Sequence, residues 1–343
     1  MTLHGVPDFS KLRVAVLGDA IADHYVVCEP RSLSREAPVM VLRHAHEYVG
    51  AGGAANVARN LRALGATTSI FGVVGRDARG RELAELLEND GVDATGLVTV
   101  AGWLTPTKTR VVAAEPRRNL QQVLRIDREP QGPAPREVRA GVVERLLARA
   151  NEFDALVLSD YEYGSIDAEL GRAAVSLAKA GKIVVLDPRA TLAGFEGLTA
   201  LTPNVGEMAR FTRRDPDELV DVRALADSAR ELLERVPTRW LLVTRGNLGM
   251  ALFGEGVPAE GASVDASGSG NVTDPTGAGD TAAAVFALAL AAGLDAPNAM
   301  RLANAASGVV VMASGCAVCS REELRAALAV APSPVRLFGV EPL

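Results

Sequence analysis

The chain has 343 residues, of which 48% are hydrophobic and 23% charged, and its formal net charge is −6. This balance is that of a globular protein with a large core, and the acidic charge argues against a nucleic-acid-binding surface. The longest apolar run is shorter than the roughly 20 residues that a transmembrane helix needs, and residues 1–11 lack a signal-peptide pattern. We therefore expect neither a nucleic acid nor a membrane as a partner.

The three cysteines are Cys28, Cys316 and Cys319. This small, odd number argues against a disulfide framework and is typical of a reducing compartment, so we expect a cytoplasmic protein. Cys316 and Cys319 have the spacing of a redox or metal-binding pair, but no second pair of cysteines would complete a zinc site. Two packed thiols are the simpler interpretation.

An apolar run of β-forming residues opens the regular part of the chain. Residues 12–17 predict a buried strand, and the carboxylates of Asp19 and Asp23 follow it. Residues 28–49 break the pattern, because the strand-like residues 39–42 have charged neighbours on both sides. This stretch predicts an insertion of antiparallel strands with one solvated face.

A glycine-rich stretch, residues 50–61, leads into a helix of small residues. Gly50, Gly52 and Ala55 match the G-x-G-x-x-A form of the dinucleotide-binding fingerprint. That fingerprint follows a buried strand, however, and the residues before Gly50 are polar. The other interpretation, which we favour, is a glycine floor for a small polar ligand with a hydrogen bond from Asn56.

Beyond these glycines, helices and strands alternate along the chain. A polar hairpin predicted at 107–114 and 121–127 would join the earlier insertion. From residue 155 onward, the alternation argues for right-handed βαβ units and a parallel sheet. The predicted strands lie at 155–158, 183–186, 200–202 and 241–243, and the predicted helices at 79–89, 137–150, 168–180, 298–312 and 321–328.

Polar residues stand at the same topological position after the predicted strands. They are Asp19, Asp160, Asp187, Asn204 and Thr244. The carboxyl ends of parallel strands share one edge of a sheet, which is where α/β proteins bind ligands. The repetition of this pattern predicts a polar site along that edge.

The stretch 274–281 reads Asp-Pro-Thr-Gly-Ala-Gly-Asp-Thr and precedes an apolar helix pattern at 282–292. The small residues Gly277–Gly279 let backbone N–H groups converge on a ligand, and a helix N-terminus favours an anion there. Asp280 beside such an anion hole suits a base that takes a proton while negative charge develops nearby. The plainer alternative is a tight turn with an aspartate at a helix start.

Asn204 and Glu207 stand three residues apart at a predicted strand-to-helix junction. They could organise a magnesium ion through water, since Mg²⁺ usually keeps several waters. The alternative is a helix cap with its partner at the third position. Phosphoryl transfer needs positioning, charge neutralisation and a proton acceptor, and the turn from Gly277 to Asp280 would supply the last two. The sequence contains no Walker motif, protein-kinase loop set, metalloprotease H-E-x-x-H or Gly-x-Ser-x-Gly elbow.

Three motifs together resemble the ribokinase-like (PfkB) sugar kinases in order and spacing. They are Gly-Gly-Ala-Ala-Asn at 52–56, Thr-Pro-Asn-x-x-Glu at 202–207 and Asp-Pro-Thr-Gly-Ala-Gly-Asp at 274–280. The likeness runs from about residue 12 to residue 328 and favours the anion hole over a plain turn and over the dinucleotide interpretation. It implies an α/β fold, a three-layer sandwich around a mainly parallel sheet with a small β lid. The kinase domain would span 1–331, with lid insertions at 22–49 and 107–128 and a C-terminal tail at 332–343.

Within that family, the chain is most similar to the bacterial heptose-7-phosphate kinases, through segments such as 34–39, 124–127 and 157–161. The resemblance implies ATP-dependent phosphorylation of the anomeric O1 of a heptose 7-phosphate. Its cofactors would be ATP and Mg²⁺, with a monovalent cation as an open addition, and the lid would form the contact of a homodimer. Such kinases can be fused to a nucleotidyltransferase. Because the chain stops soon after the kinase part, we expect that second activity to be absent.

The resemblance also implies roles for single residues. Asp280 would be the catalytic base, and Gly277, Ala278 and Gly279 would form the anion hole. The sugar or sugar phosphate would be bound by Asp19, Asp23, Gly52, Gly53, Asn56, Lys108, Arg125, Asp160 and Arg189. ATP and magnesium would be bound by Asn204, Glu207, Thr244, Gly246 and Asn304, with Asn204 and Glu207 on the metal side.

The chain departs from the heptose kinases beside the predicted site. Glu162-Tyr163-Gly164 stands where they usually have Ala-Lys-Gly, and Arg189 stands where they have a lysine. Lys108, Arg110, Arg125 or Arg189 could hold a substrate phosphate in place of the missing lysine. Fructose, ribose or a nucleoside therefore remains an alternative acceptor. A sugar or nucleotide sensor without catalysis is a further alternative, against which the intact Asp280 argues.

Overall fold

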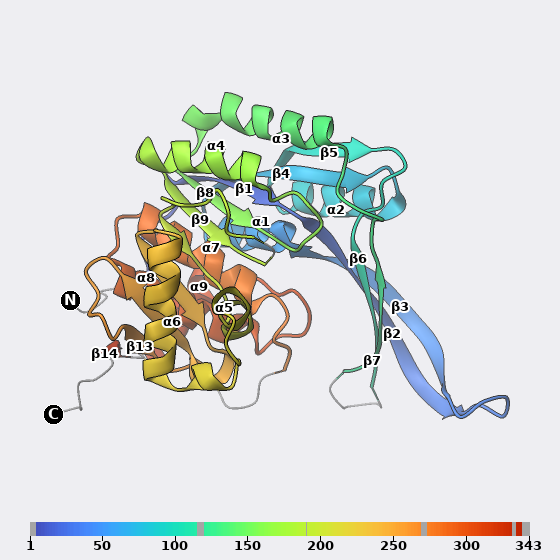
Figure 1. Cartoon of the computed structure of the whole chain (residues 1–343). Coiled ribbons are helices and arrows are strands. Elements are labelled where there is room, and N and C mark those ends of the chain that lie inside the picture. The colour runs from blue at the N-terminus through green and yellow to red at the C-terminus, as the bar shows by residue number, and fades with distance from the viewer. Residues whose placement is uncertain (1–4, 115–119, 190, 269–272, 331–333, 338–343) are drawn as a thin grey trace.

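A computed structural model describes residues 5–114, 120–189, 191–268, 273–330 and 334–337 of the chain (Figure 1). In these residues, a ten-stranded sheet with the order β14-β13-β12-β11-β10-β9-β8-β1-β4-β5 forms the centre. The pairs from β11 to β5 are parallel, and β12, β13 and β14 are added antiparallel at one edge. The strands are β1 (Arg13–Gly18), β4 (Thr67–Gly75), β5 (Asp93–Val100), β8 (Ala155–Ser159), β9 (Ile183–Asp187), β10 (Ala200–Leu201), β11 (Trp240–Thr244), β12 (Met250–Gly254), β13 (Ala262–Val264) and β14 (Arg336–Leu337).

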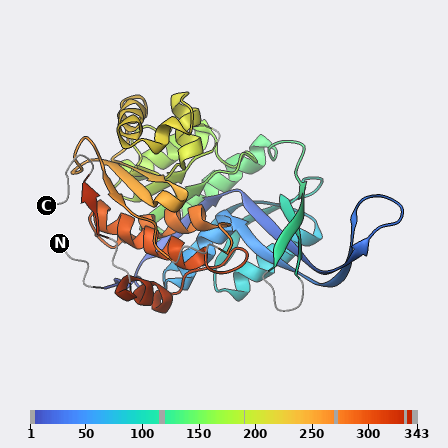
Figure 2. The ribbon, with the colours of Figure 1, turned by 90° about the horizontal axis from the view of Figure 1, so that it is seen from below.

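Helices cover both faces of this sheet, because alternate residues of its strands are apolar on both sides. In β1, Val14 and Val16 belong to one core cluster, whereas Ala15 and Leu17 belong to the other. The first cluster is completed by α1 (Ala54–Ala63), α2 (Ala78–Asn89), α7 (Ala278–Ala291), α8 (Ala296–Val310) and α9 (Arg321–Val330). The second is completed by α3 (Arg136–Ala148), α4 (Ala168–Lys179), α5 (Val205–Thr212) and α6 (Val222–Arg235). The described residues also form short 3-10 helices at η1 (Ala150–Glu152), η2 (Glu218–Val220) and η3 (Gly246–Leu248). The predicted three-layer α/β sandwich is confirmed (Figure 2).

Helix α7 is apolar all round because it is buried on every side. It contacts β8 and β9 of the sheet together with α1 and α8, and its residues from Asp280 to Leu290 are buried. Its alanines allow this close packing, since a small side chain keeps neighbouring backbones near. The helix begins at Ala278, four residues before the predicted start at 282, so Asp280 lies in its first turn.

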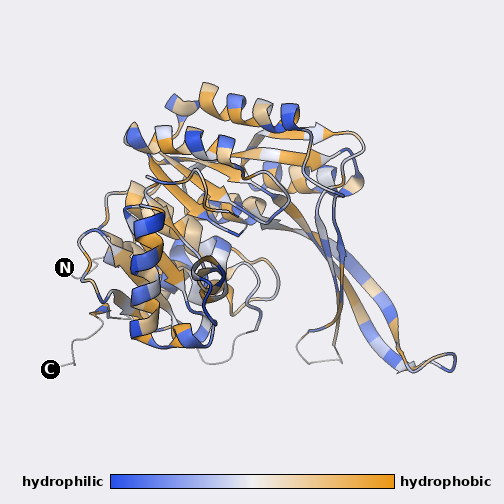
Figure 3. Ribbon diagram, viewed as in Figure 1, coloured by the Kyte–Doolittle hydropathy of each residue, from blue (hydrophilic) through white to orange (hydrophobic). Residues whose placement is uncertain are grey.

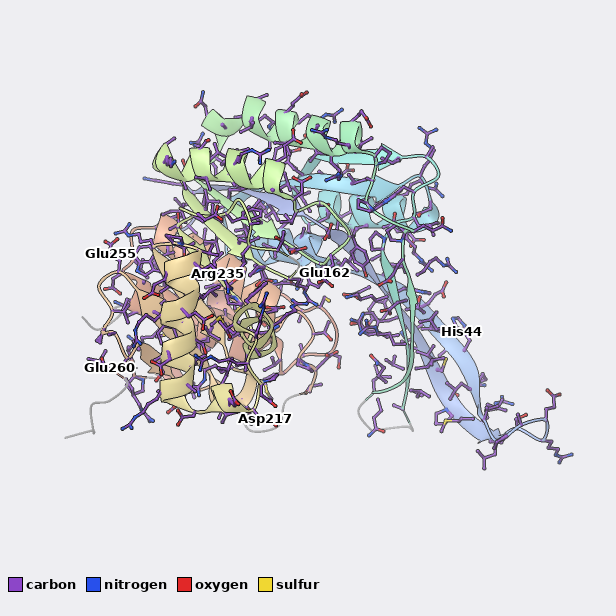
Figure 4. All side chains as sticks on the ribbon, in the orientation of Figure 1. His44, Glu162, Asp217, Arg235, Glu255 and Glu260 are labelled. Carbon is purple, nitrogen blue, oxygen red and sulfur yellow. The ribbon has the colours of Figure 1, made fainter. Side chains whose placement is uncertain are left out.

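Four further strands form a second sheet, which we call the lid sheet. Its order is β3-β2-β6-β7, and it projects from the body of the molecule (Figures 1 and 2). The strands are β2 (Ala20–Leu33), β3 (Met40–Gly53), β6 (Thr107–Ala113) and β7 (Gln121–Arg128). Strands β2 and β3 pair antiparallel along nearly their whole length, as predicted, but β3 continues to Gly53, so the glycines at 50–53 end a strand. His44, labelled in Figure 4, lies on the exposed part of β3.

Part of the predicted tail belongs to the main sheet, since Arg336 and Leu337 pair with β13. The rest of 332–343, apart from 334 and 335, lies outside the described residues, as does the predicted hairpin turn at 115–119. Strands β5, β12 and β13 and helix α6 were not predicted, and of helix α5 only the start, at the Asn204 junction, was predicted. Among the described residues, the helices are all too short or too polar to cross a membrane.

Candidate active site

A cavity of about 630 Å³ lies where the parallel strands end and the lid sheet begins. Its size suits a small-molecule ligand. It brings together residues from the lid sheet, the strand ends and the start of α7. Of the residues predicted for the site, Asp23, Gly53, Lys108, Arg189, Asn204, Glu207, Thr244, Gly246, Gly277, Ala278, Gly279, Asp280 and Asn304 line it.

The Asp280 carboxylate is one of the buried acids of this cavity, with 2% of the residue exposed. Asn56 Nδ2 donates a hydrogen bond to Asp280 Oδ2 at 2.9 Å, and the Tyr161 hydroxyl donates one to Oδ1 at 2.8 Å. Burial raises the pKa of Asp280 to about 6, although these two donors act to lower it. A carboxylate in this state is ionised near neutral pH and can still accept a proton.

The turn before Asp280 has the geometry that its sequence predicted. Gly277 is the N-cap of α7 and has a φ of 83°, in the left-handed region that glycine tolerates. The first i→i−4 bond of the helix runs from the Thr281 N–H to the Gly277 carbonyl, so the amides of Gly279 and Asp280 precede it. Free amides at the positive end of a helix favour an anion, so the geometry of this turn is compatible with the predicted anion hole.

Upstream, Asp274 fixes the turn by accepting hydrogen bonds from the Thr276 N–H and the Gly315 N–H, each at 2.9 Å. The second bond ties the turn to the loop that follows α8. Burial acts to raise the pKa of Asp274, but these donors together outweigh it and hold this pKa below its ordinary value.

The glycines at the end of β3 leave room for the acids of the site. A Cβ at Gly52 would lie 2.5 Å from Asp23 Oδ2, and one at Gly53 would lie 2.5 Å from the Asp19 carbonyl oxygen. Gly52 therefore lies against Asp23 and does not itself line the cavity. Asn56 does not line it either, and its amide holds Asp280.

The Asp23 carboxylate is shared between two partners at the base of the lid sheet. Its Oδ1 pairs with Arg110 of β6, and its Oδ2 accepts a hydrogen bond from Cys316 Sγ at 2.7 Å. Asp23 and Arg110 are both buried, so each compensates the other's charge. Cys316 and Cys319 are both free thiols; Cys316 lines the cavity, and Cys319 is buried in the core.

Two of the predicted substrate ligands hold a loop instead of lining the cavity. The Asp19 carboxylate accepts hydrogen bonds from the N–H groups of Tyr161, Tyr163 and Ser165 at 2.8–3.1 Å. Asp160 accepts from the Glu162 and Arg189 N–H groups. These aspartates thus fix the segment between β8 and α4.

Asn204 and Glu207 form a capping box at the start of α5. The Asn204 side chain accepts from the Glu207 N–H at 2.9 Å, and Glu207 Oε2 accepts from the Asn204 N–H at 2.8 Å. Both also line the cavity, where Asp187 lies with them. Burial, Glu207 and Asp280 together raise the pKa of Asp187 well above its ordinary range. The described residues contain no cluster of three His, Cys, Asp or Glu side chains arranged as a complete metal site.

Two cations lie over the ring of Tyr161 inside the cavity. Arg189 Cζ is 4.1 Å from the ring centroid and Lys108 Nζ is 5.0 Å from it. Arg189 Nε is 3.8 Å from Glu207 Oε1 and has no hydrogen-bond partner among the described residues. Arg125, by contrast, pairs with Asp127 on β7 and does not line the cavity.

The opposite end of the cavity is built from small residues. Thr244 ends β11 and Gly246 follows it, while Ser267 and Gly308 close the wall so tightly that a Cβ at Gly308 would lie 2.5 Å from the Ser267 carbonyl oxygen. Asn304 of α8 is held by a hydrogen bond from its Nδ2 to the Asp265 carbonyl at 2.9 Å.

Several cavity residues were missed by the sequence analysis. Tyr161 and Cys316 come from loops without a motif of their own, and only the segment Ser159-Asp160-Tyr161 gave a signal for the former. The sequence analysis offered Arg110 as a possible ligand for a substrate phosphate, but in the structure the Asp23 carboxylate neutralises its charge. Other missed lining residues are Ile21, Thr202, Asn247, Gly249, Met250, Ala266, Ser267, Pro275, Thr276, Ser307, Gly308 and Val311.

A mainly parallel α/β sheet, a lid sheet over its carboxyl edge and a buried carboxylate at a glycine-started helix define the ribokinase-like class of phosphotransferases. Residues 11–323 match the model of the pfkB family carbohydrate kinases, and the chain belongs to this family. It is therefore a carbohydrate kinase.

Curated relatives support the same family. The chain is 36% identical over 335 residues to the bifunctional protein HldE of Pelobacter propionicus, covering 95% of this chain and 65% of that one. It is 37% identical over 339 residues to the bifunctional protein HldE of Magnetococcus marinus, covering 95% and 66%. The chain thus spans a little under two thirds of the length of these relatives.

Solved structures share the fold at lower identity. Ribokinase of Arabidopsis thaliana, complexed with ribose and ATP, superposes with a TM-score of 0.70 at 23% identity over 93% of this chain and 99% of that one. Phosphofructokinase-2 of Escherichia coli, in complex with substrates and products, gives a TM-score of 0.72 at 19% identity over 93% and 99%. These likenesses establish the ribokinase-like fold.

Proposed function

We propose that this carbohydrate kinase transfers the γ-phosphoryl group of ATP to the anomeric O1 of a heptose 7-phosphate. The observation that carries the proposal is the buried Asp280 carboxylate, which faces the cavity in the first turn of α7. A kinase acting on a hydroxyl needs a proton acceptor and a positive potential for the phosphoryl group. The stretch Gly277–Asp280 offers both.

In this mechanism, Asp280 takes the proton of the sugar hydroxyl as the hydroxyl oxygen attacks phosphorus. The amides of the Gly277–Gly279 turn and the positive end of α7 stabilise the charge on the transferred group. Tight positioning of the hydroxyl against the phosphoryl group supplies the rest of the rate enhancement. Closure of the lid sheet would keep water from competing as the acceptor.

ATP would lie with its base at the end of the cavity lined by Thr244, Gly246 and Asn304, and its phosphates would point toward Gly277. The carboxylates of Asp187 and Glu207 suit a magnesium ion, because both are hard oxygen donors. Their negative charges also repel each other at the same cavity wall, and a bound cation would relieve that repulsion. When bound, the ion would neutralise phosphate charge.

Lys108 and Arg189 support a phosphate on the sugar. Among the residues that the structure describes, no carboxylate lies within ion-pair distance of Lys108 Nζ, and burial lowers the pKa of this group. Arg110 and Arg125 are already neutralised by Asp23 and Asp127. A doubly charged phosphate would therefore gain most from Lys108 and Arg189.

We also propose a homodimer formed through the lid sheet. Leu33, Met40, Leu124 and Ile126 lie on it and are each more than half exposed, and Figure 3 shows apolar residues along this projecting sheet. An exposed apolar sheet surface favours association with a second protein surface.

An acceptor screen tests the proposal. Purified protein with ATP and Mg²⁺ would be assayed for ADP release with heptose 7-phosphate, fructose, ribose and a nucleoside. We expect turnover with heptose 7-phosphate, and for Lys108→Met a KM for this sugar raised about tenfold or more with little change in the KM for ATP. Arg125→Met is the matched control, because its cation already has a partner. No turnover of heptose 7-phosphate beside clear turnover of another sugar would refute the choice of substrate.

A further inference from the structure

The Asp280 carboxylate is held from two sides by groups of different origin. Asn56 of α1 donates to Oδ2, and the Tyr161 hydroxyl, from the segment after β8, donates to Oδ1. A carboxylate held by two donors keeps one orientation, with its remaining lone pairs directed to other ligands.

The backbone of Tyr161 is fixed independently of its side chain. Its N–H donates to Asp19 Oδ2 at 2.8 Å, and the neighbouring Glu162 N–H donates to Asp160 Oδ1 at 2.9 Å. The ring also passes close to the glycine at the end of β3, since a Cβ at Gly53 would lie 3.2 Å from Tyr161 Cδ2. The sheet edge therefore determines where the phenol can go.

The ring of Tyr161 is held by cations from two parts of the molecule. Lys108 belongs to β6 of the lid sheet, and Arg189 follows β9 of the main sheet. Figure 1 shows β6 running from the projecting lid sheet toward the body of the molecule. Cation–π contacts on the ring favour the rotamer that brings the hydroxyl to Asp280.

We propose that Tyr161 is a positioning residue for the catalytic base: its hydroxyl orients the Asp280 carboxylate, and its ring, packed by Lys108 and Arg189, holds the hydroxyl in place. The inference rests on the proposed function, in which Asp280 accepts the proton of the sugar. Asp19 then has an indirect role, because its carboxylate holds the loop that carries Tyr161. This role explains why the Asp19 carboxylate, although it stands at a strand end, is turned away from the cavity.

The hydroxyl also acts on the charge of the base. A donor to the carboxylate stabilises its ionised form, so loss of the Tyr161 hydroxyl raises the pKa of Asp280 further. The other groups that face Asp280 electrostatically are the carboxylates of Asp23 and Asp187, the Arg189 guanidinium and the Cys316 thiol. Removal of the hydroxyl alone changes the chemistry of none of them.

The test is Tyr161→Phe, which keeps the ring between its cations and removes only the donor. ADP release would be measured from pH 5 to 9 with heptose 7-phosphate, ribose and fructose, and the parent protein would decide which acceptor is used for the variants. We expect kcat to fall about tenfold or more at pH 7, the acidic limb of the pH profile to move to higher pH and the KM for the sugar to change little.

Tyr163→Phe is the matched control, because the Tyr163 hydroxyl donates to Glu129 at 2.9 Å outside the cavity. It should leave both kcat and the pH profile unchanged. The inference is overturned if Tyr161→Phe behaves like the parent, or if it lowers kcat while the acidic limb stays where it was. Failure of the proposed function would show separately, as turnover by Asp280→Asn that equals the parent's.

Discussion

Replacing Asp280 by asparagine should remove activity and increase stability at the same time. The substitution preserves shape, since the amide oxygen can accept from Asn56 while the amide nitrogen donates to the Tyr161 hydroxyl oxygen. It removes the proton acceptor, so kcat should fall by about 10²–10⁴, the scale of a lost general base. It also removes a buried charge, which is a cost to the folded state.

The size of the stability gain follows from the pKa of Asp280. Burial raises this pKa from 3.8 to about 6, and each pH unit of displacement is worth about 1.4 kcal/mol. The folded chain binds the proton of Asp280 more tightly than the unfolded chain does. The parent therefore loses free energy of unfolding as the pH rises from 3.8 to about 6, and this loss remains in full at higher pH. Asp280→Asn should therefore be more stable by up to about 3 kcal/mol at pH 8 and by about half of that at pH 5.

Urea unfolding of parent and variant at pH 8 and pH 5, together with kcat from ADP release, measures both effects. Asp274→Asn is the control of opposite sign in the same loop, because hydrogen bonds hold the pKa of Asp274 below its ordinary value. That variant should lose stability at pH 8. If Asp280→Asn were no more stable than the parent at pH 8, or gained equally at both pH values, the assignment of a buried charge would be wrong.

Two further substitutions test the turn and the lid sheet. Gly277→Ala should lower the free energy of unfolding by about 1–2 kcal/mol, because Gly277 has a φ of 83°. It should also lower kcat, because its Cβ would lie 2.6 Å from the Asn56 Nδ2 that holds Asp280. Gly293→Ala, with a φ of 84° and open space around it, should show the same loss of stability with an unchanged kcat. Leu124→Glu should shift the sedimentation of a dimer to that of a monomer, whereas Val220→Glu, equally exposed but away from the lid sheet, should not; a parent protein that sediments as a monomer would contradict the proposed dimer.

Much of the fold could be predicted because its strands are buried on both faces. The runs at 12–17, 155–158 and 183–186 are short, apolar and bounded by polar residues, and each matches an observed strand within a residue or two. Strand β5 was missed because residues 93–100 combine glycine, threonine and aspartate in a strand with mixed exposure. Strands β12 and β13, which lie inside β14 near one edge of the sheet, were missed because nothing local distinguishes an antiparallel addition to a parallel sheet.

Topology predicted the location of the site better than the direction of its side chains. Asp19 and Asp187 both stand at the carboxyl edge of the sheet, yet Asp19 turns to three backbone amides and Asp187 faces the cavity. The difference depends on the segment after β8, which returns across Asp19 and offers its N–H groups. Such a long-range hydrogen-bond pattern leaves no local trace in the sequence.

The environment of Asp280 explains why its partners could not be inferred from its motif. A buried carboxylate with a raised pKa needs donors that keep it ionised, but the donors that hold it, Asn56 and Tyr161, lie outside the turn from Gly277 to Gly279. The donors must then come from other elements. Asn56 of α1 and Tyr161 after β8 are about 100 residues apart in sequence and meet only because β1 lies beside β8 and α1 packs on α7. The pKa of this base therefore depends on contacts that exist only in the assembled sheet edge. Loss of the single Tyr161 hydroxyl should for that reason alter the pH at which the base works.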